Sequence, residues 1–189
     1  MQVEGKGRVA PSPVQIRLRM PARALMNAAG QRESFRRYSE RRDQWGHGLT
    51  KDAVLTGLVG EAALCHYLNR TLGVRLAPDT SLRREGDGGR DIVCRGLIIQ
   101  VKTRRKAGGE NLIRRVDGDA NLLPLHAHIL SFGFWDGQAN PQLLGWGWTR
   151  ELLGLATLKR SRVADHFNLV VDSEHLQPMS RLADVLVAR

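Results

Sequence analysis

Cysteine and long apolar runs are scarce in this sequence. Only two of its 189 residues are cysteines, Cys65 and Cys94, and no CxxC or Cys/His cluster occurs. That scarcity argues against a zinc site and favours a reducing compartment such as the cytoplasm. No apolar run is long enough to span a membrane, and the N-terminus lacks the continuous apolar stretch of a signal peptide. We therefore expect a cytoplasmic protein without a membrane segment.

Acidic residues are also in the minority. The chain has 29 Lys and Arg residues against 19 Asp and Glu, which gives a formal net charge of +10. Such an excess predicts a polyanionic partner, most simply nucleic acid bound through its phosphates. Ribosomal and membrane-surface proteins share this balance, so charge alone does not identify the function. The length and the 42% hydrophobic content fit one globular domain.

The hydrophobic patterning predicts a mixed α/β domain with a central sheet. We expect residues 1–20 to form a flexible basic arm with a short strand at 14–18, and residues 21–189 to form a single domain. Residues 103–120 are basic and contain glycine, so we expect them to be mobile. The expected helices cover residues 22–45, 51–72, 150–158 and 181–187, and the expected strands cover 91–94, 97–102, 126–135, 141–148 and 167–171.

Capping and turn residues mark several of these boundaries. Thr50, Thr149 and Ser180 suit the N-caps of three helices, because their hydroxyls can accept a backbone N–H of the first turn. Gly73 suits the C-cap of the second helix. Arg95-Gly96 suits a tight turn between the first two strands of the domain, and it predicts a hairpin there.

Glu61 stands out on the expected helix over residues 51–72. At about 100° per residue, this helix has an apolar stripe with Glu61 in its middle. A carboxylate in that position is buried or at the mouth of a pocket, so it requires a cation, a metal or strong donors. Taken by itself, Glu61 is slightly better explained by a structural ion pair with a buried arginine. The stripe consists of Val54, Leu58, Cys65, Leu68 and Leu72.

Three polar residues interrupt the apolar hairpin that follows. The turn brings Asp91 near Gln100 and Lys102, which are two residues apart and therefore share one face of their strand. A divalent cation between Asp91 as an oxygen ligand and Lys102 as a fixed positive charge would explain them. Mg²⁺ or Mn²⁺ suits carboxylate and amide oxygens. The alternative is an edge strand with a solvated face, and the apolar residues around Val101 argue against it.

The order of these residues resembles a known superfamily. Gly60-Glu61 on a helix, then Gly89-Arg90-Asp91-Ile92, then Gln100-Val101-Lys102-Thr103 resembles the PD-(D/E)XK nucleases. That superfamily includes restriction endonucleases and archaeal-type Holliday-junction resolvases. The resemblance covers about residues 50–105. It implies a restriction-endonuclease-like fold, in which a mixed central β-sheet is flanked by helices.

The resemblance also implies roles for individual residues. Asp91 would be the main metal ligand, Gln100 would offer its amide oxygen, and the Val101 backbone carbonyl would be a further ligand. Glu61 would reach the metal directly or through water, and Lys102 would act on the attacking water. Two positions depart from the usual pattern. Gln100 replaces the acidic residue before x-Lys, which removes one negative charge, and Arg90 replaces the more usual proline before the aspartate.

Basic residues around this motif are candidates for phosphate contacts, with a solvated surface as the alternative reading of nearly equal weight. One group lies on the first expected helix, and the other directly follows the motif, where Thr103 could also support Lys102. The candidates are Arg36, Arg37, Arg41, Arg42, Thr103, Arg104, Arg105 and Lys106. We expect Trp135, Trp146 and Trp148 to pack a hairpin against the core, although base stacking is an alternative.

Together, these features predict a magnesium-dependent DNA endonuclease that acts on branched or otherwise structured DNA. No small-molecule cofactor is expected. A homodimer is compatible with the resemblance, because resolvase-like members act as dimers. A phage, a mobile element or a repair pathway would suit such an enzyme. Two alternatives stay open: a non-catalytic nucleic-acid-binding module that keeps the fold, which Gln100 favours, and an RNA-acting protein.

Overall fold

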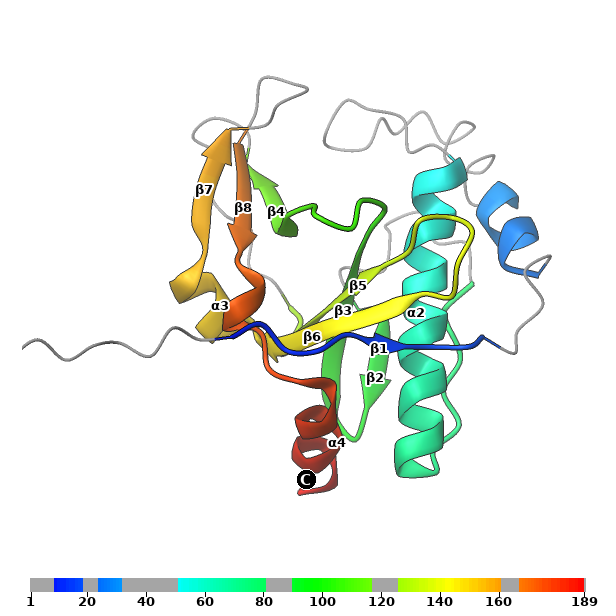
Figure 1. Cartoon of the computed structure of the whole chain (residues 1–189). Helices are drawn as coiled ribbons and strands as arrows, with labels where there is room; N and C mark the ends of the chain where they lie inside the picture. Colours follow the sequence, from blue (N-terminus) through cyan, green and yellow to red (C-terminus); the bar gives the residue numbers. More distant parts are fainter. Residues whose placement is uncertain are drawn as a thin grey trace, which may run out of the picture.

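The computed structural model describes residues 9–18, 24–31, 51–80, 90–116, 126–160 and 167–188. Within these ranges, the chain forms a five-stranded sheet of order β1-β6-β5-β3-β2 and a three-stranded sheet of order β4-β8-β7, together with helices (Figure 1). β3 and β5 are parallel, and the other neighbouring strands are antiparallel. The mixed α/β class is therefore confirmed.

The elements have the following bounds. The strands are β1 (Val14–Gln15), β2 (Ile92–Cys94), β3 (Leu97–Arg104), β4 (Asn111–Val116), β5 (Ile129–Phe134), β6 (Gln142–Trp148), β7 (Thr157–Arg160) and β8 (Phe167–Val171). The helices are α2 (Lys51–Leu72), α3 (Thr149–Leu155) and α4 (Met179–Val187), with a short 3₁₀ turn η1 (Ser173–His175). Residues 24–31 are also helical.

α2 has the length that the sequence predicts. Asp52 in its first turn complements the positive end of the helix dipole. The helix ends at Leu72, because Gly73 adopts the left-handed conformation (φ 67°) and donates its N–H to the Asn69 carbonyl at 3.1 Å. The Asn69 side chain then bonds both the N–H and the carbonyl of Leu76, at 2.7 and 2.8 Å. These bonds fix the direction in which the chain leaves the helix.

The β2–β3 hairpin also forms where the sequence predicts it. Arg95 (φ 49°) and Gly96 (φ 79°) are both left-handed, which matches the twist of a two-residue hairpin. The register pairs Ile92 with Ile99. The Arg95 guanidinium donates to the carbonyls of Leu186 and Val187 at the end of α4, at 3.2 and 3.5 Å. The hairpin is thereby attached to the last helix.

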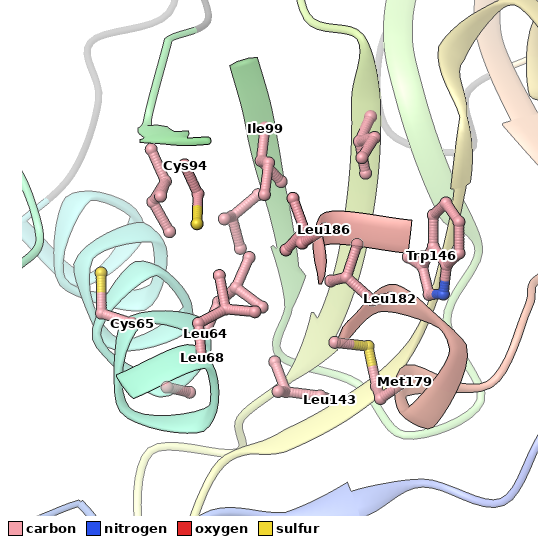
Figure 2. Packing of buried hydrophobic residues seen from close by; sticks show 14 of the residues in the cluster. Leu64, Cys65, Leu68, Cys94, Ile99, Leu143, Trp146, Met179, Leu182 and Leu186 are labelled. Carbon is pink, nitrogen blue, oxygen red and sulfur yellow. The ribbon is translucent and has the colours of Figure 1, made fainter. Parts of the chain in front are cut away.

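Both faces of the larger sheet are covered. On one face, α2 and α4 enclose the main core, and Figure 2 shows Leu64 and Leu68 of α2 opposite Leu182 and Leu186 of α4. On the other face, a second cluster joins β5 to α3, β4 and β8. β3 contributes to both clusters, because its side chains alternate. Its contributions are Leu97, Ile99 and Val101 to the main core and Ile98 to the second cluster.

Several expected boundaries differ from the observed ones. The stretch 103–120 was expected to be mobile, yet residues 111–116 form β4, which pairs with β8. Thr149 is the first residue of α3 and not its cap, because Trp148 is extended at the N-cap position. α3 stops at Leu155, and Leu158 belongs to β7. The last helix starts after Pro178, so Ser180 is not its cap.

The short strand expected within the N-terminal segment is present at Val14–Gln15, shorter than the expected 14–18. Val14 and Gln15 pair with β6 at the edge of the larger sheet, and Ile16 is buried in the main core. Within the expected helix over 22–45, only residues 24–31 are described. No helix in the described part of the chain is long and apolar enough to cross a membrane.

Candidate metal and nucleic-acid site

The site begins where α2 lies against β3 (Figure 1). At Gly60 the helix backbone packs tightly on Thr103 of β3, and the missing side chain is essential to this packing. A Cβ on Gly60 would overlap the Thr103 Oγ1 atom and would lie 2.9 Å from Thr103 Cβ. The hydroxyl oxygen of Thr103 therefore packs directly against the helix backbone, so the Thr103 side chain faces α2. That orientation does not suit the phosphate contact expected for this residue.

Glu61 follows Gly60 and is buried, with 7% of its surface exposed. This burial agrees with its position in the apolar stripe of the helix. Its charge acts on Cys65, one helical turn away. Burial is the main reason that the pKa of the Cys65 thiol rises to about 12, and the negative charge of Glu61 raises that pKa further, followed by Cys94. α2 thus carries a carboxylate in a largely apolar environment beside the sheet.

Asp91 lies immediately before β2, at the edge of β3. Its Oδ2 accepts the backbone N–H of Val101 at 2.6 Å. β2 pairs only with the part of β3 between Leu97 and Ile99, so beyond that point the carboxylate takes the place of a strand. Short bonds to a carboxylate are the strong ones. Asp91 is therefore held in a defined position at this edge.

The same bond fixes the direction of the Val101 carbonyl. In a β-strand, the N–H and the C=O of one residue point to the same side. Val101 donates toward Asp91, so its carbonyl also points to that edge. The even-numbered residues of β3 point the other way, since the carbonyls of Ile98 and Arg104 accept N–H groups of His128 and Trp135, which flank β5. Asp91 and the Val101 carbonyl are thus brought together.

Gln100 and Lys102 share the face of β3 that is turned away from α2. Continuing the hairpin register by one residue brings Gln100 opposite Asp91, and Lys102 lies beside Phe132 of β5. The Gln100 Oε1 atom is buried and accepts no hydrogen bond from the described residues. A buried amide oxygen without a donor is an acceptor that a cation could satisfy.

The expected ligands therefore approach β3 from both of its faces. Glu61 comes from α2 on one face, whereas Gln100 and Lys102 belong to the other. Within the described residues, β3 has no neighbouring strand beyond Ile99 on the side of Asp91, so a cation at this edge could be reached from both faces. Among the described residues, no three His, Cys, Asp or Glu side chains gather as a metal-binding group. A cation there would need the Gln100 and Val101 oxygens, and such oxygen donors fit Mg²⁺ or Mn²⁺.

The Arg104 side chain makes hydrogen bonds within the protein. Its guanidinium donates to the Gly109 carbonyl, to the Ala107 carbonyl at 2.9 Å and to Asn111 Oδ1 at 2.9 Å. Burial lowers the pKa of Arg104. Asn111 is itself buried and donates to the Val171 carbonyl and to Ser173 Oγ, at 3.1 and 2.9 Å. Arg104 therefore shapes the loop after β3 and connects it to the smaller sheet.

Arg105 and Lys106 are exposed just beyond β3. Arg105 pairs with Asp52 of α2 at 3.5 Å, donates to the Asp136 carbonyl at 3.2 Å and lies over the Trp135 ring at 5.6 Å. The loops after β3 and β5 therefore meet, because parallel strands end at the same edge of a sheet. Lys106 is exposed next to Arg105 and is a candidate for a phosphate contact. Arg36, Arg37, Arg41 and Arg42 lie outside the described residues.

The tryptophans divide between packing and polar contacts. Trp146 is fully buried in the main core, and its indole N–H donates to the Pro178 carbonyl at 3.0 Å. Trp148 meets it edge-on at 5.9 Å between ring centres. Trp135 packs partly against the helices, and its N–H donates to the Ala139 carbonyl at 2.9 Å. The packing expectation is confirmed for Trp146.

Two contributions were missed at the sequence level. The Gly60–Thr103 contact had one available signal, because a glycine in the middle of a helix is unfavourable without a packing reason. The buried role of Asn111 had no comparable signal, since its partners are about 60 residues away in the sequence.

Comparisons of the chain with protein-family models, with curated proteins and with solved structures find no match. A function is therefore inferred from the residues of this chain and from the geometry around Asp91.

Proposed function

We propose that the chain is a metal-dependent DNA nuclease of the PD-(D/E)XK type, with a restriction-endonuclease-like arrangement of α2, β2, β3 and β5. The observation that carries this proposal is the bond between Asp91 Oδ2 and the Val101 N–H. It turns a carboxylate and a backbone carbonyl toward the same open strand edge. The buried carboxylate of Glu61 and the buried amide oxygen of Gln100 add two oxygen donors of the type that Mg²⁺ prefers.

Each residue then has a defined task. Asp91 and the Val101 carbonyl would hold the cation, while Gln100 and Glu61 complete its oxygen ligands. When bound, Mg²⁺ or Mn²⁺ supplies the positive charge that polarises the scissile phosphate and the attacking water. Lys102 orients that water or stabilises the negative charge that accumulates on the phosphate.

The basic surface supports DNA as the substrate. A net charge of +10 favours phosphate binding through counterion release. Lys106 is exposed four residues after Lys102, so a DNA backbone that reaches the site can contact it. Branched or otherwise structured DNA is the proposed target, and a homodimer is the proposed assembly. Analytical ultracentrifugation tests the assembly directly.

A second candidate function is a nucleic-acid-binding module without turnover. The specific observation in its favour is Gln100, which lacks the negative charge of a carboxylate. A site with fewer negative charges holds a divalent cation less tightly. Such a module would still bind DNA through its basic surface, with the steep salt dependence of phosphate contacts.

Cleavage assays separate the two functions. The purified chain is incubated with plasmid, single-stranded DNA, a four-way junction and a structured RNA, each with Mg²⁺, Mn²⁺ or EDTA. Lys102→Met removes the proposed acting amine. Lys159→Met is the matched control, because Lys159 lies in the smaller sheet and pairs with Glu110 and Asp172.

We expect metal-dependent cleavage by the parent chain and by Lys159→Met, and none by Lys102→Met. Equal cleavage by Lys102→Met would show that the site is wrong. DNA binding without cleavage by any protein would favour the binding module. Cleavage of the RNA but of no DNA would transfer the proposal to an RNA-acting enzyme.

A further inference from the structure

α2 contains two glycines one turn apart, and they have different surroundings. A Cβ built on Gly57 meets nothing within 4 Å. A Cβ built on Gly60 overlaps Thr103 Oγ1 and lies 2.9 Å from Thr103 Cβ and 3.3 Å from Thr103 Cγ2. Real Cβ atoms essentially never approach another atom so closely, so alanine at position 60 would force α2 or β3 to shift. The helix backbone therefore packs tightly against the sheet at Gly60, and does not do so at Gly57.

Gly60 and Thr103 are each next in the sequence to a residue of the proposed site. Gly60 precedes Glu61 in α2, and Thr103 follows Lys102 in β3. A shift of the helix away from Thr103 moves Glu61 away from the strand edge, where Asp91 bonds Val101. We propose that Gly60 and Thr103 are positioning residues, whose contact sets the depth of the Glu61 carboxylate relative to that edge. This inference rests on the proposed metal site.

The local chemistry supports a role beyond packing. Glycine is an unfavourable residue inside a helix, because it loses more backbone freedom than alanine. The Thr103 hydroxyl oxygen is buried and has no hydrogen-bond partner among the described residues, which is also unfavourable. On the other side, a Cβ built on Gly133, the β5 neighbour of Thr103, would lie at an ordinary contact distance of 3.5 Å from Thr103 Oγ1, so the tight contact of Thr103 is with Gly60. Two unfavourable features at one contact indicate that the close approach itself is needed.

The test measures Mn²⁺ binding in the absence of DNA, by electron paramagnetic resonance of the free ion. The variants are Gly60→Ala, Gly57→Ala, Thr103→Ala, Thr103→Ser and the double variant Gly60→Ala/Thr103→Ala. Circular dichroism and thermal melts report the fold of each protein. Cleavage kinetics with saturating Mg²⁺ then separate kcat from KM.

We expect Gly60→Ala to weaken Mn²⁺ binding at least tenfold and to lower kcat by up to about a hundredfold, the loss associated with a displacement of roughly 1 Å at a reacting group. KM for DNA should stay within about twofold, because the basic surface is unchanged. Gly57→Ala should bind Mn²⁺ as the parent does. The double variant should regain part of the lost affinity, because removing Thr103 Oγ1 and Cγ2 makes room for the new methyl group.

If Gly60→Ala does not fold, Thr103→Ala and Thr103→Ser decide the question. Alanine at position 103 removes the Oγ1 atom that contacts Gly60, whereas serine keeps a hydroxyl oxygen there. Only Thr103→Ala should therefore weaken Mn²⁺ binding. Equal affinities for parent, Gly60→Ala and Thr103→Ala would overturn the positioning role. Failure of the proposed function has a different signature, because the parent chain itself would then neither bind Mn²⁺ nor cleave.

Discussion

Asp91 has two tasks that different substitutions can separate. Its carboxylate holds the Val101 N–H at 2.6 Å, and in the proposed site it also binds a cation. Alanine removes both functions. Asparagine keeps an oxygen that can accept the N–H, but it removes the negative charge. Comparing the two variants therefore shows how much of the role of Asp91 is structural.

The expected effects on stability follow from the hydrogen bond. A bond to a charged group contributes about 1.5–3 kcal/mol and a neutral one about 0.5–1.5 kcal/mol. Asp91 is only partly buried, so we take about 2 kcal/mol for the loss in Asp91→Ala and about 1 kcal/mol for Asp91→Asn. In a chain of this length, 1 kcal/mol shifts Tm by roughly 2–4 °C. Tm should therefore fall by about 4–8 °C in the alanine variant and by about 2–4 °C in the asparagine variant.

Thermal melts in EDTA measure these shifts without a metal contribution, and plasmid cleavage with Mg²⁺ measures the chemistry. Both variants should lose cleavage, although asparagine should lose only about half as much stability as alanine. Asp172→Asn is the control, because Asp172 is exposed and pairs only at 3.8 Å with Lys159. If asparagine lowered Tm as much as alanine does, the bond to Val101 would not be the structural anchor. If Asp91→Asn cleaved like the parent, the metal-ligand role would be refuted.

Three further predictions follow from the described contacts. Leu68→Ala, in the fully buried core under α2, should cost about 2–5 kcal/mol in urea unfolding, whereas Val93→Ala on the exposed face of β2 should cost little. Burial raises the Cys65 pKa from 9.0 to about 12, so the folded chain holds this proton more tightly than the unfolded chain. The resulting stability is fully present below pH 9 and is lost as the pH rises to about 12. Cys65→Ala should therefore reduce the fall in unfolding free energy across that window, while the raised pKa values of Cys94 and Tyr67 leave part of it. Lys106→Gln should reduce the slope of log K against log salt by about 1, measured by the fluorescence anisotropy of labelled DNA. Arg104→Gln should leave that slope unchanged and lower Tm, because the Arg104 guanidinium donates hydrogen bonds to Ala107, Gly109 and Asn111.

Local signals predicted the elements that local chemistry determines. α2 was predicted because its apolar stripe is long and Gly73 ends it, and the β2–β3 hairpin was predicted because Arg95-Gly96 suits its turn. β4 was not predicted, since it depends on pairing with β8, which is far away in the sequence. β7 was not predicted because its first residues were assigned to the preceding helix. A basic segment such as residues 111–116 is typical of a loop until its pairing partner is known.

In the candidate site, too, local sequence patterns predicted some features and not others. The burial of Glu61 followed from helix periodicity, and the shared face of Gln100 and Lys102 followed from strand alternation. The bond from Val101 to Asp91 depends on hairpin register at the level of single atoms, which residue patterns do not specify. Thr103 and Arg104 were candidates for phosphate contacts because of their residue types and their place at the end of the motif. In the structure, Thr103 contacts Gly60 and Arg104 bonds Asn111. Both are tertiary contacts that only the folded chain reveals.

Gln100 determines how the proposed site should couple cation and DNA. Glu61 and Asp91 provide two negative charges and Lys102 one positive charge, so a divalent cation leaves the site with excess positive charge. A DNA phosphate would supply the negative charge that Gln100 lacks, so each ligand should strengthen binding of the other, and by the same factor. Mn²⁺ affinity should therefore rise when an uncleavable phosphorothioate duplex is added. Gln100→Glu should bind Mn²⁺ more tightly without DNA and show a smaller rise, because its carboxylate already supplies that charge. An equal rise in both proteins would mean that position 100 does not contact the cation.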